Sequence, residues 1–252
     1  MLIKQAAKII RASKYAVALT GAGISTPSGI PDFRSNNGGL WHRFNPMEVA
    51  SLSIFRVKPE RFYNWFRPLT KQILTAEPNE AHKALAHLET QGKLKSVITQ
   101  NIDGLHQKSG SGVVLEVHGT IYTLTCVSCY ANFPVSQFSD AYINTGAIPH
   151  CPNCENILKP DAILFEEQLP QKTWQMVENE IIKCDLLIVV GSSLEVFPVA
   201  RLPFKIVNQG GKLIIINKQE TYIDSRADVV LHRDAAEILP LIVDRVRDVG
   251  SI

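Results

Sequence analysis

The segment Tyr15-Ala-Val-Ala-Leu-Thr-Gly-Ala-Gly23 joins an apolar run to a Gly-Ala-Gly turn. A near-continuous apolar run that ends in glycine is typical of a parallel strand buried on both faces of a sheet. Similar runs occur at three later places in the chain, each before polar or glycine residues: Leu94–Thr99, Asp185–Val190 and Lys212–Ile216. Helical periodicity separates them, as in residues 171–183, and this alternation predicts a Rossmann-like α/β fold with an open parallel sheet.

The tips of these strands predict where a ligand binds. Polar or glycine residues follow each run, at Gly21, Gln100, Gly191 and Asn217. Open α/β sheets bind their ligands outside the carboxyl ends of the strands. We therefore expect the four tips to converge on one site.

Two stretches interrupt the α/β pattern and predict a smaller lobe. Residues 36–92 show mostly helical periodicity with several aromatic side chains, and residues 121–159 are rich in Ser, Pro and Asn. We expect a single two-lobed catalytic domain, whose Rossmann-like lobe comprises residues 1–35, 93–120 and 160–252. The substrate cleft should lie between the lobes.

The composition bounds the partners. The 252 residues include 45% hydrophobic and 20% charged residues, and the formal net charge is +2. Such a mild charge does not favour nucleic acid as a direct partner, and no apolar run approaches the roughly 20 residues of a membrane span. The N-terminal segment 1–11 has an amphipathic pattern without the features of a signal peptide. We expect a cytoplasmic protein without membrane contact.

Four of the five cysteines form two pairs with metal-ligand spacing, Cys126/Cys129 and Cys151/Cys154, separated by 21 residues. Four thiolates complete a tetrahedral zinc shell, and a closed shell is structural rather than catalytic. Two disulfides are the alternative, which a reducing compartment disfavours. The fifth cysteine, Cys184, precedes an apolar run and is expected in the core.

The turn Gly21–Thr26 should open a helix and could hold a pyrophosphate on its backbone N–H groups. As a dinucleotide fingerprint it is incomplete, since Thr26 stands where a third glycine belongs. A simple strand-to-helix connection is the alternative. The following loop, Ser28–Arg34, adds an aromatic ring and a guanidinium that can grip phosphate.

His118 is a candidate general base. It follows the apolar run Val113–Val117 and precedes Gly119, so it should lie at a strand tip. The ordinary pKa of histidine, about 6.5, suits proton transfer near neutral pH. A surface or structural histidine is the alternative. His106 more simply supports its loop, and Asp103 could be a binding group or a helix cap.

Taken in order, these motifs resemble the sirtuin family of NAD-dependent protein lysine deacylases. The matching segments, which extend over residues 15–236, are Gly21–Ser25, Gly29–Arg34, Thr99–Asp103, His118-Gly119, the cysteine quartet and Gly191–Ser193. The resemblance implies NAD and a structural zinc as cofactors. It also implies acyl-lysine proteins or peptides as substrates, with the acyl group passing to ADP-ribose as nicotinamide leaves.

The resemblance also assigns roles by position. His118 would be the general base, and Asn101 would order water or ribose hydroxyls. The positions that would bind NAD are Gly21, Ala22, Thr26, Ile30, Phe33, Arg34, Gln100, Asn101, Ile102, Asp103, His118, Gly191, Ser192, Ser193, Asn217 and Ala235. Within this set, Arg34 would lie near the phosphates, Asp103 at the nicotinamide carboxamide and Ala235 at the adenine.

Two loops would hold the acyl-lysine peptide between them as an added strand, largely through the backbone. The expected contacts are Ile163, Phe165, Glu166 and Val196. The family usually has glycine at position 166 and an apolar residue at position 195, whereas this chain has glutamate at both. These acids could favour Lys or Arg beside the target lysine, or could simply face solvent.

The acyl preference depends on a Tyr-x-x-Arg pair that family members use to hold succinyl or malonyl groups. The matching positions are Tyr63 and Phe66, so the arginine is missing, and Arg67 is one residue away. We expect acetyl and longer aliphatic acyl groups over succinyl, unless these rings are only core. The rival functions are ADP-ribose transfer to protein and a non-catalytic NAD- or ADP-ribose-binding zinc module. A dehydrogenase fits less well, because the third glycine is missing.

Overall fold

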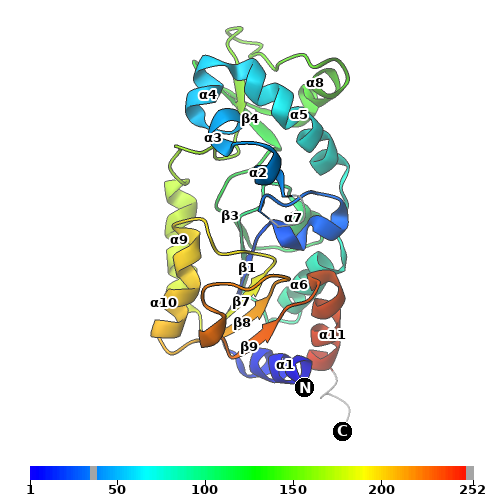
Figure 1. Ribbon diagram of the computed structural model, residues 1–252, viewed down its shortest axis with the longest axis vertical. Coiled ribbons are helices and arrows are strands. Elements are labelled where there is room, and N and C mark those ends of the chain that lie inside the picture. The colour runs from blue at the N-terminus through cyan, green and yellow to red at the C-terminus, as the bar shows by residue number, and fades with distance from the viewer. Residues whose placement is uncertain (35–38, 248–252) are drawn as a thin grey trace.

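The computed structural model describes residues 1–34 and 39–247. The expected boundary between residues 35 and 36 lies outside the described residues. The chain forms a large lobe around a six-stranded sheet and a small lobe that lies beyond the carboxyl ends of its strands (Figure 1). Connecting segments, among them the loop after β3, run between the two lobes.

The large sheet is entirely parallel, which confirms the predicted fold class. Its strands, in spatial order, are β3 (Val114–Glu116), β2 (Ser96–Thr99), β1 (Ala16–Thr20), β7 (Leu186–Val190), β8 (Lys212–Ile216) and β9 (Val229–Leu231). From β1 the chain builds outward in one direction and then, at β7, starts again on the other side. A crevice opens at such a switch point in doubly wound sheets, and ligands bind there.

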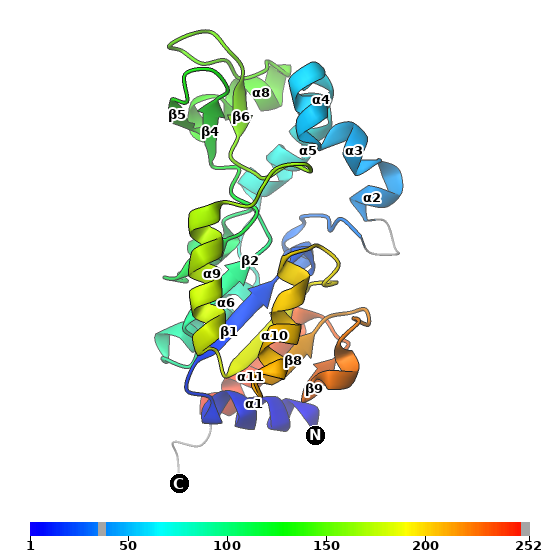
Figure 2. The ribbon, with the colours of Figure 1, turned by 90° about the vertical axis from the view of Figure 1, so that its left-hand side faces the viewer.

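Helices cover both faces of this sheet. One face carries α1 (Leu2–Ala12), α6 (Glu80–Thr90) and α11 (Ala235–Arg247), and the other carries α9 (Gln171–Lys183) and α10 (Leu202–Asn208) (Figure 2). Alternate side chains of the central strands enter the two cores. In β1, for example, Ala18 packs into the first core and Leu19 into the second. Burial on both faces explains why these strands read as continuous apolar runs.

The small lobe has a helical part and a sheet part. The helices are α2 (Leu40–Arg43), α3 (Pro46–Val49), α4 (Leu52–Val57) and α5 (Pro59–Thr75), and they pack on a core of aromatic rings that includes Phe55, Phe62 and Tyr63. The sheet part is antiparallel. It comprises β5 (Asn132–Pro134), β4 (Thr123–Cys126) and β6 (Leu158–Pro160), with α8 (Ser139–Thr145) beside it. The short helix α7 (Leu105–Lys108) lies between the lobes.

The expectation that Gly21–Thr26 opens an α-helix is wrong. Two 3₁₀ turns, Ala22–Ile24 and Thr26–Ser28, follow β1 instead, and the backbone turns away at Gly29, whose φ of +86° is left-handed. Pro27 lies at the first turn of the second 3₁₀ segment, and the Thr26 hydroxyl donates to the carbonyl of Gly23. These local hydrogen bonds replace a continuous helical ladder.

Candidate active site

The loops after β1 and β7 meet at the switch point with no room for side chains. The backbone N–H of Gly23 donates to the carbonyl of Gly191 at 2.8 Å. A Cβ on Gly191 would lie 2.2 Å from the backbone nitrogen of Ile24, and its φ of +60° is left-handed. A Cβ on Gly21 would lie 2.8 Å from the Gly191 carbonyl oxygen. Glycine at these positions lets the two loops close the floor of a cavity.

An outer groove of about 500 Å³ opens at this floor. Its lining includes these positions expected to bind NAD: Gly21, Ala22, Thr26, Phe33, Arg34, Gln100, Asn101, His118, Gly191, Ser192, Ser193, Asn217 and Ala235. Lys218, Gln219 and Arg233 also line it and were not predicted. They belong to the loops after β8 and β9. Polar residues are common in loops, so their sequence alone does not indicate that they line a binding site.

An inner pocket of about 400 Å³ continues the groove toward the small lobe. It gathers the remaining predicted positions, which are Ile30, Ile102, Asp103, Ile163, Phe165 and Glu166. Six residues line both cavities together with Val196: Ala22, Phe33, Arg34, Gln100, Asn101 and His118. The fold therefore brings together every predicted NAD and substrate position. His118 stands where the two cavities join.

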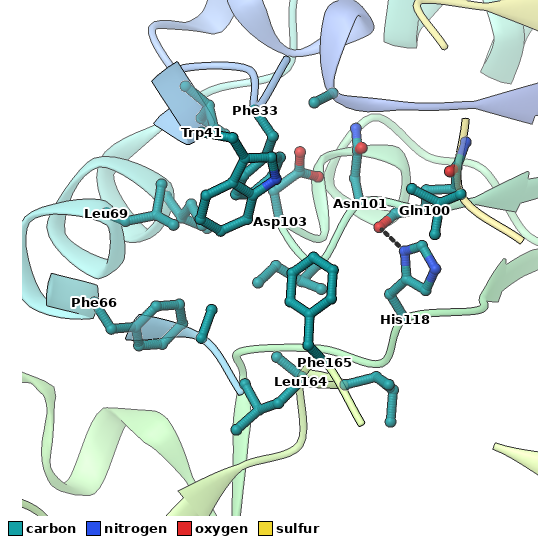
Figure 3. A pocket seen from close by; sticks show the side chains of 18 of the residues that line it. Phe33, Trp41, Phe66, Leu69, Gln100, Asn101, Asp103, His118, Leu164 and Phe165 are labelled. Atoms are coloured by element: carbon teal, nitrogen blue, oxygen red, sulfur yellow. Dashed lines mark hydrogen bonds between the residues drawn. The ribbon is translucent and has the colours of Figure 1, made fainter. Parts of the chain in front are cut away.

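The geometry of His118 makes it a competent base. Its Nδ1 lies 3.0 Å from the carbonyl oxygen of Gln100 (Figure 3). Because a carbonyl oxygen only accepts, Nδ1 carries the proton and Nε2 keeps its lone pair. Burial, with a smaller contribution from the nearby Arg34 guanidinium, lowers the pKa of His118 below its ordinary value. The ring is therefore neutral near pH 7.

Gly119 fixes the loop that carries His118. Its φ is +71°, and a Cβ there would lie 1.9 Å from the carbonyl oxygen of Asp161. The carbonyl of His118 accepts from the N–H of Ile163 at 2.8 Å. His118 is thus joined directly to the segment that leads into the expected substrate loop.

A buried polar cluster lies beside His118. The Ser25 hydroxyl donates to Oδ2 of Asp103 at 2.7 Å and accepts from Nδ2 of Asn101 at 3.1 Å. Asp103 also accepts at Oδ1 from the N–H of Leu105, the first residue of α7, so it holds the start of that helix as well as lining the pocket. Burial raises the pKa of Asp103. Ser25 belongs to the glycine motif, and only the fold shows that its hydroxyl joins Asp103 and Asn101.

Two buried histidines lie close to this cluster, one next to Ser25 and the other next to Thr20 at the end of β1. His106 Nε2 lies 2.9 Å from the Thr20 hydroxyl, and His82 Nε2 lies 3.4 Å from that of Ser25. Burial lowers the pKa of His82 to about 4 and that of His106 to about 3. Both rings are neutral near pH 7 and hold the loops of the site, the supporting part expected of His106.

The far wall of the inner pocket is apolar. Trp41, Phe66 and Leu69 lie across the pocket from His118 (Figure 3). Trp41 and Leu69 were missed, since single apolar residues in a helical stretch look like core. Tyr63 is buried, and its hydroxyl donates to the carbonyl of Leu158. Arg67 donates from Nε and Nη2 to the carbonyl of Ile143, at 2.9 and 2.6 Å.

The two unusual glutamates have partners within the chain. Glu166 adopts the left-handed region with φ of +73°, a conformation that glycine reaches without strain. Its Oε2 accepts from both the N–H and the hydroxyl of Ser53, at 2.9 and 2.6 Å. Glu195 Oε2 lies 3.2 Å from Nε of Arg34. Because both carboxylates already have partners within the chain, they do not by themselves favour Lys or Arg beside the target lysine.

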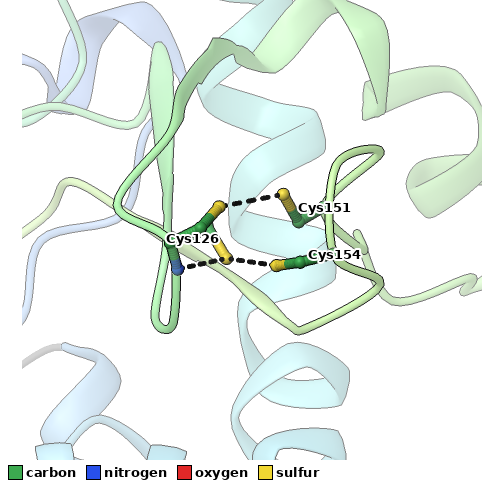
Figure 4. Close-up of side chains that lie close together, drawn as sticks. Cys126, Cys151 and Cys154 are labelled. Atoms are coloured by element: carbon green, nitrogen blue, oxygen red, sulfur yellow. Dashed lines mark hydrogen bonds between the residues drawn. The ribbon is translucent and has the colours of Figure 1, made fainter.

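The cysteine quartet forms one metal-sized cluster (Figure 4). Its four Sγ atoms lie within 4.8 Å of one another, with 3.4 Å between Cys126 and Cys154 and 3.6 Å between Cys129 and Cys151. These spacings exceed a disulfide bond of about 2.05 Å. They fit a tetrahedral shell with Zn–S bonds of about 2.3 Å. Cys184 is buried beneath the large sheet, as expected.

Comparison with known proteins decides the family. The family model described as "Sir2 family" matches residues 21–198, which is more than half of the chain. The chain belongs to the Sir2 family. It is 46% identical to NAD-dependent protein deacylase 2 of Archaeoglobus fulgidus, over 99% of this chain and 98% of that protein.

Solved Sir2 structures agree with the fold. One Sir2 enzyme structure has a TM-score of 0.92 at 44% identity and covers 98% of both chains. A Sir2 protein bound to a myristoylated histone peptide has a TM-score of 0.85 at 40% identity, covering 99% of this chain and 98% of that one. The predicted enzyme class, an NAD-dependent protein deacylase, is confirmed, and the cysteine cluster fits the predicted structural zinc. No helix among the described residues is long and apolar enough to span a membrane.

Proposed function

We propose that this Sir2 protein removes acetyl and longer aliphatic acyl groups from lysine side chains, with His118 as the general base. The observation that carries the proposal is the place and protonation of His118. Its ring stands at the junction of the two cavities, with the proton held on Nδ1 by the Gln100 carbonyl. Nε2 is left free to accept a proton from a reacting group.

The outer groove has the donors that a dinucleotide needs. Backbone N–H groups and hydroxyls of the loops after β1 and β7 line it, together with the Arg34 guanidinium, and such groups suit a pyrophosphate. Asn217 and Ala235 would hold the adenosine end, and Ile30, Ile102 and Asp103 the nicotinamide end. Bound NAD supplies the ribose carbon that accepts the acyl oxygen as nicotinamide leaves.

The residues around that ribose carbon would transfer a proton, bind the ribose and the carboxamide, and exclude water. His118 would take a proton from a ribose hydroxyl, and burial keeps its ring neutral for that task. Asn101 and Asp103, joined through Ser25, would present an amide and a carboxyl to the nicotinamide-side ribose and carboxamide. The rings of Phe33 and Phe165 line the same pocket and would limit access of water.

The inner pocket is large for an acetyl group. At about 400 Å³ it falls in the size range of sites for much larger ligands. A relative with a TM-score of 0.85 binds a myristoylated peptide. The apolar wall formed by Trp41, Phe66 and Leu69 suits an aliphatic chain in the same way.

We assign a separate role to each part of the chain from the positions of these sites. We propose that residues 1–35, 93–120 and 160–252 bind NAD, that residues 36–92 form the acyl pocket wall, and that residues 121–159 are a zinc-stapled module. We place the enzyme in the cytoplasm, because an unoxidised cysteine quartet needs a reducing compartment. A net charge of +2 gives no support to direct nucleic-acid binding.

The direct test is incubation with NAD and a set of acyl-lysine peptides, following nicotinamide and peptide mass together. Equal amounts of nicotinamide and deacylated peptide are expected. A peptide mass raised by one ADP-ribose would instead indicate transfer to protein. Binding of NAD without release of nicotinamide would contradict catalysis altogether.

A further inference from the structure

An ion pair joins the NAD-binding loop to the expected substrate loop. Nε of Arg34 lies 3.2 Å from Oε2 of Glu195, and the two side chains are 31% and 61% exposed. Arg34 follows the 3₁₀ turns after β1, whereas Glu195 follows β7. The two partners are 161 residues apart in the sequence, so only the fold brings the two charges together.

Local hydrogen bonds fix the backbone at or next to both Arg34 and Glu195. The N–H of Arg34 donates to Oδ1 of Asp32 at 3.0 Å. Leu194, just before Glu195, is buried and left-handed with φ of +56°, and its N–H donates to the Ser192 hydroxyl at 3.2 Å. The turn at Leu194 therefore determines where the Glu195 side chain begins.

Arg34 holds a special place among the cations of the site. Three cations line the outer groove, but among the described lining residues only Arg34 is an arginine or lysine that also lines the inner pocket. Lys218 pairs with Asp234 at 2.7 Å and Arg233 with Glu237 at 3.5 Å, each within its own region of the chain. Arg34 is also close enough to lower the pKa of His118.

We propose that Glu195 competes with phosphate for Arg34 and so weakens the binding of NAD and of ADP-ribose products. The inference rests on the proposed role of the outer groove as the NAD site. A guanidinium binds phosphate through paired N–H donors, and the Glu195 carboxylate lies 3.2 Å from one of the Arg34 nitrogens that would carry them. Glu195 is therefore a tuning residue, which acts on the ligand through Arg34.

The size of the effect is bounded by the exposure of the pair. Exposed ion pairs of this kind contribute modestly, so replacing Glu195 should tighten ligand binding about two- to fivefold. The change should shrink as salt is raised, because screening weakens the competing ion pair. A ligand without phosphate should not sense the substitution.

The test is binding of ADP-ribose to the full chain, measured by calorimetry at low and high salt. Glu195→Gln should bind ADP-ribose more tightly than wild type, whereas adenosine, followed by NMR titration, should bind both equally. In an Arg34→Gln background the same substitution should have no effect. Glu220→Gln is the matched control, since Glu220 lines a neighbouring surface groove with Glu195 and the charge change is identical.

The outcomes separate this inference from the proposed function. If wild type binds ADP-ribose but Glu195→Gln binds it equally or more weakly, Glu195 does not compete for Arg34 and the inference is overturned. The same conclusion follows if Glu220→Gln gives an equal gain, or if the gain persists without Arg34. Failure of wild type to bind ADP-ribose at all would overturn the assignment of the groove, and this inference with it. Melting temperatures of all variants verify that they are folded.

Discussion

The hydroxyl of Ser25 donates to the carboxylate of Asp103 at 2.7 Å. The same hydroxyl accepts from the amide of Asn101 at 3.1 Å, so one small side chain orders two groups of the inner pocket. All three side chains are buried. A buried polar group that loses its partner costs free energy, which makes this hydroxyl a sensitive point of the site.

Replacing Ser25 by Ala should weaken NAD binding and turnover. Asp103 Oδ2 and Asn101 Nδ2 would each lose a buried partner, at a cost of about 1–3 kcal/mol per group. We expect the KM for NAD to rise about tenfold or more. Ser111→Ala is the control, since the buried Ser111 hydroxyl has no hydrogen-bond partner in the described structure. Equal effects of the two substitutions would mean that the Ser25 hydroxyl does not order the site.

Replacing His118 by Ala should abolish deacylation while ADP-ribose still binds. Loss of a general base typically costs about 10²–10⁴-fold in rate, and the ring occupies only the junction of the cavities. Single-turnover rates and calorimetry measure the two effects separately. Turnover at the wild-type rate would require another base. His106 is the nearest alternative in sequence, although its Nε2 is already bound to Thr20.

The pH dependence of kcat/KM should reflect the lowered pKa of His118. A base must be neutral, so activity is present above the pKa of the folded enzyme and is lost as the pH falls through it. Burial lowers that pKa, and the acid limb should therefore lie below pH 6.5, the ordinary value for histidine. A limb at or above that value would show that the imidazolium is stabilised in the free enzyme.

The sequence allowed the chemistry of the site to be predicted better than its walls. Glycines at 21 and 191, the strand runs and the cysteine spacing each depend on strong local rules, and the structure places them as those rules require. The walls depend on long-range packing. In the sequence, Trp41 and Leu69 look like ordinary core residues, and only the fold places them in the pocket wall opposite His118. The edge strand β9 has only three residues, too few to give a recognisable strand pattern in the sequence.

Removing the zinc should destabilise the small lobe. One zinc per chain is expected, and Cys126→Ser or Cys151→Ser should lower both zinc content and melting temperature, because the metal contributes folding free energy directly. Strong chelators should act in the same direction. Cys184→Ala is the control: it lies outside the cluster and should keep its zinc. A metal-free, reduced protein that keeps its full melting temperature and activity would contradict a structural zinc.

The acyl preference should favour acetyl and aliphatic groups over succinyl by more than tenfold in kcat/KM. The far wall of the inner pocket is apolar, and burying a carboxylate there without a partner is unfavourable. Arg67 cannot supply that partner while it donates two hydrogen bonds to the Ile143 carbonyl. One step along a helix turns a side chain by about 100°, which separates Arg67 from the pocket-lining Phe66.

The decisive variant is Phe66→Arg, which places a guanidinium in the wall. We expect it to gain activity on succinyl-lysine and to lose activity on long aliphatic groups, measured as kcat/KM on matched peptides. Arg67→Gln is the paired control; because its side chain faces α8, the acyl preference should stay the same even if stability falls. If the wild type were equally active on succinyl-lysine, and Arg67→Gln removed that activity, then Arg67 would reach the pocket in the working enzyme and the apolar wall would not set the preference.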